Sequence, residues 1–183
     1  LQIENPDIFT ENDLATSLQP FLKEIITEIT KNELLYTTWF KLFSEHIGSS
    51  KFAFNVLRVK NYGSDVSDYF LRVEVSDLEN NNGIGILTIE EALRAYDTIN
   101  EIYIITTEII MGSREYSEIN IECSSNIKIG VFGEMNNWEA YITINSIQTF
   151  ISIKDFKNFE LFIQKGIEKI DQLMELNSNP IQS

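Results

Sequence analysis

Clustered basic residues and long apolar runs are both missing from this sequence of 183 residues. It has 14 Lys and Arg residues against 28 Asp and Glu residues, a formal net charge of −14. Because affinity for phosphate depends on clustered Lys and Arg, this balance argues against direct nucleic-acid binding and against docking on an anionic membrane. The longest apolar run, 102–111, is interrupted by polar residues and is shorter than the roughly 20 residues of a membrane-spanning helix.

Cysteine and histidine occur once each, and this restricts the available chemistry. Cys123 has no second cysteine to pair with, which fits a reducing compartment, and no secretory leader pattern is visible, so we expect a cytoplasmic location. A nucleophilic site would need Cys123 together with His46, yet neither lies in a recognisable nucleophile turn. We expect His46 in the last turn of a helix. No catalytic residue, metal or cofactor is predicted, and the protein is not expected to be an enzyme.

The first fifty residues predict two helices. Apolar side chains recur at three- and four-residue spacing over 14–29. Pro20 interrupts this pattern and fits the first turn of a helix that begins near Ser17 to Pro20. The same spacing returns over 34–47 after a capping-box pattern at Thr30–Glu33. Gly48 fits the left-handed position that ends such a helix.

The middle of the chain predicts a hairpin followed by a short helix. Runs of apolar and β-branched residues at 52–59 and 69–76 flank the turn residues 61–65. The stretch 77–85 is a loop by composition. Thr88–Glu91 has capping-box spacing and begins the helix.

The second half of the chain predicts a strand-rich region that ends in a helix. The expected strands cover residues 101–111, 117–124, 126–134, 138–146 and 148–154. Short connections between them favour an antiparallel meander. A last helix is expected over 155–176, with Asp155 as its N-cap.

These elements follow the order αα-ββ-α-βββββ-α and define the α+β class. We expect one antiparallel sheet of about six to seven strands, mostly a meander, with helices packed on one face. Residues 1–176 are expected to form a single globular domain, and 177–183 a flexible C-terminal tail. No convincing internal repeat is found, although a pair of strands followed by a helix occurs twice.

A cluster of acidic and amide residues in the hairpin turn and after the hairpin resembles a calcium loop only in part. Its members are Asp65, Asp68, Asp77, Glu79 and Asn80 to Asn82. A loop that starts at Asp77 has Asn82 where glycine is needed and Thr88 where glutamate is needed. A solvated polar turn is the better interpretation.

Residues 101–150 hold seven acidic and only two basic residues. Alternation puts Glu118 and Glu122 on the opposite face of one strand from its isoleucines. It also separates Glu139 and Tyr141 from Trp138 on another strand. Because like charges on one face repel, this arrangement would make sense if a basic partner covers them. The plain alternative is a solvated acidic face that only aids solubility.

The predicted partner-binding residues belong to this face and to the loop beside it. They are Glu108, Glu118, Glu122, Glu134, Trp138, Glu139 and Tyr141. The first interpretation is an acidic, inhibitory protein-binding protein that neutralises a basic partner, either a bacterial nuclease-type toxin, as immunity proteins do, or a nucleic-acid-binding protein, as a DNA mimic does. This is an analogy of physical type, and no family motif supports it.

Two other interpretations stay open. One is an enzyme or small-ligand carrier with an aromatic pocket between the sheet and the helices. Its candidate lining residues are Trp39, Phe40, Phe43, Phe54, Phe70, Phe132, Phe156 and Phe159. The other is a structural subunit of a homo-oligomer that pairs through an exposed sheet edge.

Overall fold

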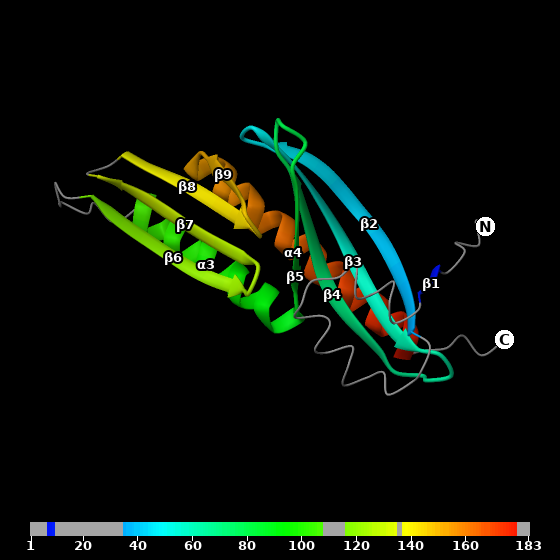
Figure 1. Cartoon of the computed structure of the whole chain (residues 1–183). Helices are drawn as coiled ribbons and strands as arrows, with labels where there is room; N and C mark the ends of the chain where they lie inside the picture. Colours follow the sequence, from blue (N-terminus) through cyan, green and yellow to red (C-terminus); the bar gives the residue numbers. More distant parts are fainter. Residues whose placement is uncertain (1–6, 10–34, 108–115, 135–136, 179–183) are drawn as a thin grey trace.

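The chain folds into two antiparallel sheets rather than the single sheet expected from the sequence (Figure 1). The computed structural model describes residues 7–9, 35–107, 116–134 and 137–178. Sheet 1 contains β1 (Asp7–Phe9), β2 (Leu35–Ile47), β3 (Ser50–Asn61), β4 (Ser67–Ser76) and β5 (Asn82–Leu87). Sheet 2 contains β6 (Ser117–Ser124), β7 (Ile127–Glu134), β8 (Asn137–Ile144) and β9 (Ile147–Ile151). The α+β class and the antiparallel meander are confirmed.

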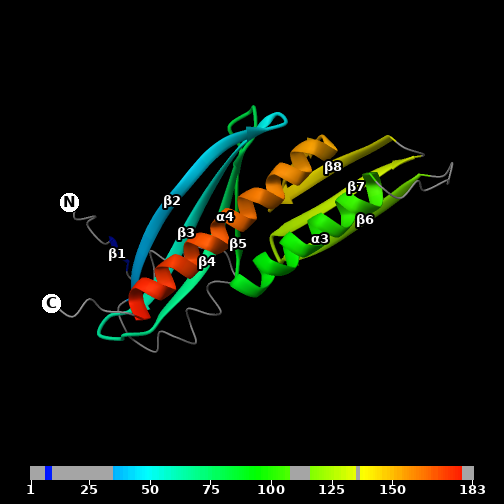
Figure 2. The same cartoon turned by 180° about the vertical axis from the view of Figure 1, so that it is seen from behind.

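Two helices lie on the same side of the two sheets, as the view from behind makes clear (Figure 2). Helix α3 (Ile89–Thr107) follows β5, and helix α4 (Ile153–Ser178) follows β9. The order from β2 onward is therefore four strands and a helix, twice. This architectural repeat was only faintly visible in the sequence, because the residues of the two blocks do not match. Neither described helix is long and apolar enough to cross a membrane.

The predicted helix over 34–47 is wrong at 35–47, because these residues form strand β2. A bulge between Lys41 and Phe43 shifts the register, so Phe40 and Phe43 both face the α4 side. Phe43 stacks on Phe54 at a centroid distance of 5.1 Å and contacts Phe162 of α4 at 4.8 Å. Because of the bulge, two residues that are three apart in the sequence share a face, and this is the spacing that is typical of a helix.

Both faces of sheet 1 bury side chains, and this adds to the helix-like appearance of β2. Leu57, the β3 neighbour of Trp39, is fully buried on the face opposite Phe54. Leu35 of β2 is 2 % exposed. A strand that is apolar on both faces loses the alternation that marks strands in a sequence.

The predicted strand over 101–111 is wrong at 101–107, which complete helix α3. Ala92, Ala95, Ile99 and Ile102 are buried at helical spacing, so packing decides the structure of a run that is rich in β-branched residues. The predicted loop over 77–85 is also too long, since β5 begins at Asn82. The hairpin, the other four strands and the last helix are confirmed.

Of the two predicted helix N-caps, the one at Thr88 is confirmed and the one at Asp155 is wrong. Glu91 N donates to Thr88 Oγ1 at 3.2 Å and Thr88 N donates to Glu91 Oε2 at 2.9 Å, which is the predicted capping box. Helix α4 is capped by Ser152 and not by Asp155 as predicted. Asp155 N donates to Ser152 Oγ at 3.0 Å, and the Ser152 hydroxyl donates to Asp155 Oδ2 at 2.8 Å.

Helix α4 packs on sheet 1 through aromatic rings and one glycine. Phe159 contacts Phe52 and Phe54 at centroid distances of 5.7 and 5.5 Å, and all three rings are almost fully buried. A Cβ at Gly166 would lie 2.5 Å from Leu71 Cδ1, so the glycine allows a close approach of α4 to β4. The helix extends to Ser178, into the tail predicted from residue 177. The predicted helix over 14–29 and the Thr30–Glu33 cap lie outside the described residues.

The two sheets meet along β5 and the β2–β3 turn. The Ser50 and Thr149 hydroxyls form a buried hydrogen bond of 2.8 Å between sheet 1 and β9. Asn145 Nδ2 donates to the backbone oxygen of Ile84 at 3.1 Å. These contacts fix the position of sheet 2 relative to sheet 1.

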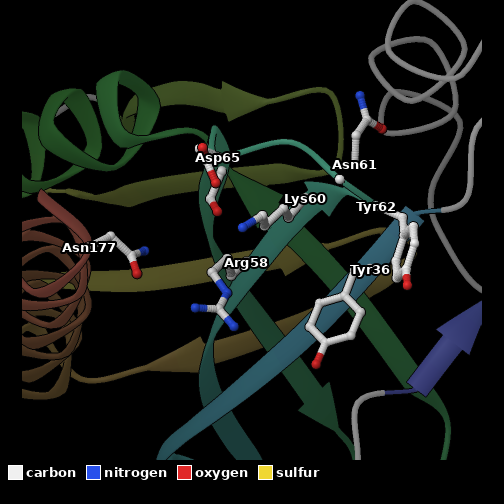
Figure 3. A pocket seen from close by; sticks show the side chains of 9 residues that line it. Tyr36, Arg58, Lys60, Asn61, Tyr62, Asp65 and Asn177 are labelled. Atoms are coloured by element: carbon white, nitrogen blue, oxygen red, sulfur yellow. The ribbon is translucent and has the colours of Figure 1, made fainter. Parts of the chain in front are cut away.

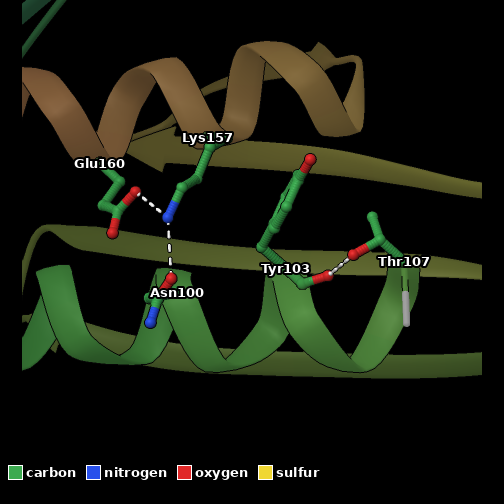
Figure 4. A network of polar contacts seen from close by, with 5 residues as sticks. All are labelled: Asn100, Tyr103, Thr107, Lys157 and Glu160. Carbon is green, nitrogen blue, oxygen red and sulfur yellow. Dashed lines mark hydrogen bonds and ion pairs between the residues drawn. The ribbon is translucent and has the colours of Figure 1, made fainter. Parts of the chain in front are cut away.

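Helices α3 and α4 are joined by a polar network (Figure 4). Lys157 Nζ donates to Asn100 Oδ1 at 2.8 Å and forms an ion pair with Glu160. It also lies 5.4 Å from the centre of the Tyr103 ring. Glu160 is 2 % exposed, so Lys157 compensates a carboxylate that is removed from water.

Candidate functional site

One face of sheet 2 is covered by neither described helix, since α3 and α4 both lie behind the opposite face (Figures 1 and 2). Strand register assigns its side chains, because directly paired residues share a face. We call it the open face, formed by Glu118, Asn120, Glu122, Lys128, Gly130, Phe132, Glu139, Tyr141, Thr143, Gln148 and Phe150. The alternation predicted for β6 and β8 is confirmed by this register, except that Asn145 lies in the β8–β9 turn.

An aromatic cluster occupies the middle of the open face and the residue just before β6. Phe132 contacts Phe150 edge-on at 5.7 Å between ring centroids, and Tyr116 and Tyr141 each at 6.2 Å. Phe150 is 54 % exposed and Tyr116 is 65 % exposed. Large exposed rings in mutual contact are unusual on a monomer surface unless they serve an interaction.

Tyr141 is the buried base of this cluster. Its ring lies against Gly130, where an added Cβ would be 2.8 Å from Tyr141 Cζ. The Tyr141 hydroxyl donates to Glu118 Oε1 at 2.6 Å across the intervening strand β7. Burial first, and then the hydrogen bond and the charge of Glu118, raise the pKa of Tyr141 well above its ordinary value. Tyr141 is thus a neutral donor at physiological pH.

A shallow hollow of about 560 Å³ opens beside these rings. Tyr116, Phe132 and Phe150 form its apolar wall, and Glu118, Lys128 and Gln148 provide polar groups. Lys128 Nζ lies 6.0 Å from the centre of the Tyr141 ring. An apolar centre with charged groups at its border is the composition of a protein-interaction surface.

The predicted partner-binding residues only partly coincide in space. Glu118, Glu122, Glu139 and Tyr141 share the open face. Trp138 lies on the opposite face and packs against the hydrophobic core. Glu134 is the last residue of β7, and Glu108 lies outside the described residues.

Sequence reasoning missed the aromatic members of the open face. Phe132 pairs with Glu139 and Phe150 pairs with Tyr141, so both phenylalanines share the face on which alternation put Glu139 and Tyr141. That step needs the strand register, which the sequence does not provide.

Among the described strands and helix α3, the acidic excess lies in sheet 2 and α3 and not in sheet 1. The strands of sheet 2 contain four acidic residues and one basic residue, and α3 has the same balance. The strands of sheet 1 contain five basic and four acidic residues. Among these described elements, the acidic excess therefore includes both the open face and the helix side behind it.

The other candidates for chemistry have structural explanations. Cys123 is fully buried, and burial raises the pKa of its thiol to about 12. His46 is exposed on strand β2 and not in the helical turn predicted for it. The aromatic residues proposed to line one pocket are divided between places, since Phe54 and Phe159 pack together in the core while Phe132 lies on the open face.

The acidic loop after β4 is a turn held by its own hydrogen bonds. Asp77 Oδ1 accepts from the backbone N–H groups of Glu79 and Asn81 at 2.9 and 2.8 Å. Asn81 Nδ2 donates to Asp77 Oδ2, which lowers the pKa of Asp77. Within the described ranges, no group of three or more His, Cys, Asp or Glu side chains is arranged to hold a metal ion.

Searches against known protein families and curated proteins find no match to this chain. The open face itself is therefore the basis for proposing a function.

Proposed function

We propose that this protein binds and neutralises a basic protein partner through the open face of sheet 2. The observation that carries the proposal is the exposed aromatic cluster bordered by carboxylates on a sheet face that neither described helix covers. Aromatic anchors supply most of the binding free energy at protein interfaces, while surrounding charges steer association and select the partner.

The partner is expected to be basic because the acidic groups near the cluster have little internal compensation. Glu122 and Glu139 form no ion pair with any residue that the structure describes. Lys128 is the only basic residue in the strands of sheet 2. A bacterial nuclease-type toxin or another nucleic-acid-binding protein has the complementary surface, since its phosphate-binding site is rich in Lys and Arg.

Photo-crosslinking in the native host tests this proposal. A photoreactive phenylalanine analogue replaces Phe150 on the open face, and Leu161 on α4, which is 45 % exposed, provides the matched control position. We expect position 150 alone to capture one protein, and we expect that protein to have a basic surface. Capture of an acidic protein, equal capture from both positions, or no specific capture from position 150 would contradict the proposal.

A further inference from the structure

A second hollow, of about 680 Å³, lies at the β3–β4 hairpin end of sheet 1 (Figure 3), which is remote from sheet 2 (Figure 1). The β3–β4 hairpin approaches the last turn of α4 there. Its walls include Tyr36, Arg58, Lys60, Tyr62, Asp65 and Asn177. This volume is typical of small-molecule pockets, and the lining is mainly polar.

Two basic side chains point into this space in a chain that has half as many bases as acids. Arg58 and Lys60 are two residues apart on β3 and therefore share a face. Figure 3 shows both side chains and the Asn177 amide directed toward the same region. Neither base forms an ion pair with a described residue.

The Arg58 guanidinium is held in place by contacts that leave most of its donors without a partner among the described residues. Its Nη2 donates to Thr38 Oγ1 at 3.1 Å, and its Cζ lies 5.5 Å from the centre of the Phe40 ring. The enclosed Nε has no hydrogen-bond partner in the part of the chain that the structure describes. A planar guanidinium fixed in this way is suited to bidentate binding of a carboxylate or phosphate, with Lys60 as an additional point charge.

The structure points to this pocket as a binding site for a small oxyanion ligand, one that carries a phosphate or carboxylate group. An alternative role for the two bases is to compensate the negative end of the α4 dipole, because the last turn of α4 has no basic residue of its own. Asp65 also lines the pocket, and its negative charge disfavours a ligand that carries many negative charges.

Thermal unfolding of the full chain in sodium phosphate and in sodium citrate tests the assignment, with sodium chloride of matched ionic strength as reference. Ligand binding to the folded state raises the unfolding midpoint with ligand concentration. We expect this rise with at least one of the two anions below about 20 mM, and the effective anion identifies the ligand class. A midpoint that does not respond to either anion would overturn the assignment.

Variants separate ligand binding from helix compensation. Arg58→Gln and Lys60→Gln are expected to weaken the anion response about tenfold, because each removes a charged donor from the pocket. Lys51→Gln removes the same charge from an exposed position of the same strand and should respond like the wild type. If Arg58→Gln does not fold, Lys60→Gln alone decides. A wild-type response in the pocket variants would show that the bases serve only the helix end.

Discussion

Tyr141 and Glu118, 23 residues apart in sequence, are joined by a 2.6 Å hydrogen bond that crosses strand β7. The contact is possible because Gly130 of β7 has no side chain to displace the tyrosine ring. One glycine thus determines that the hydroxyl reaches a carboxylate at the edge of the open face. The Tyr141 ring contacts the Phe132 ring, and Phe150 is the cross-strand neighbour of Tyr141 on β9.

The Tyr141→Phe variant tests this hydrogen bond. We expect the free energy of unfolding at pH 7 to fall by about 1 kcal/mol, because Glu118 is exposed and regains water as a partner. The folded-state pKa of Tyr141 is raised, so its contribution is complete below the unfolded value of about 10 and is lost as the pH rises through the folded value. The difference between wild type and variant, measured by urea denaturation, should therefore shrink above about pH 10. Tyr96→Phe removes a tyrosine hydroxyl from α3, away from Glu118, and is the control for the loss of a hydroxyl alone.

Because of the ion pair between Lys157 and Glu160, we expect the single variant Lys157→Met to lose much more unfolding free energy than the double variant. Lys157→Met leaves the buried Glu160 carboxylate without its cation and should cost about 3 kcal/mol of unfolding free energy. The double variant with Glu160→Met should regain most of this loss, since no charge stays buried. Lys154→Met on the same helix removes an exposed lysine and should be nearly neutral. A double variant as unstable as Lys157→Met would show that packing, and not charge compensation, is lost.

The sequence predicted the strands of sheet 2 well, because each has one buried and one open face and therefore alternates. It failed at β2, where a bulge puts Phe40 and Phe43 on one side and a second buried face removes the polar positions. The prediction also failed at 101–107, which is a run of strand-forming residues. These residues are helical because packing of Ile102 in the core outweighs their strand propensity. For the site, the periodicity found Glu118 and Tyr141 but not their contact with Phe132 and Phe150, since neighbours across strands depend on register.

The buried contact between Ser50 and Thr149 should couple the two sheets energetically. Thr149→Val leaves the Ser50 hydroxyl without its partner and is expected to destabilise the protein by about 1–3 kcal/mol. Adding Ser50→Ala removes the unsatisfied group, so the double variant should be more stable than the sum of the two single effects. Thr143→Val makes the same chemical change on the open face and should be almost without effect. Strict additivity in chemical denaturation would contradict the coupling.

Cys123 should react with iodoacetamide only when the protein unfolds. Its thiol is fully buried and its pKa is raised to about 12, so little thiolate exists at pH 8 in the folded state. Mass spectrometry over a urea series should show labelling that follows global unfolding. Rapid labelling of the native protein would indicate that the core between α3 and sheet 2 opens locally.

We propose that the open face of sheet 2 recruits a basic partner by charge and holds it by aromatic contact. The most direct test is the association rate constant of the crosslinked partner with two charge-reversal variants that alter net charge equally. Glu139→Lys lies on the open face, and Glu101→Lys lies on α3, which shares the acidic excess but lies behind the sheet. We predict that Glu139→Lys slows association about tenfold at low salt, that Glu101→Lys has a much smaller effect, and that the difference fades at high salt. Equal effects of the two variants, or rates independent of salt, would contradict the account.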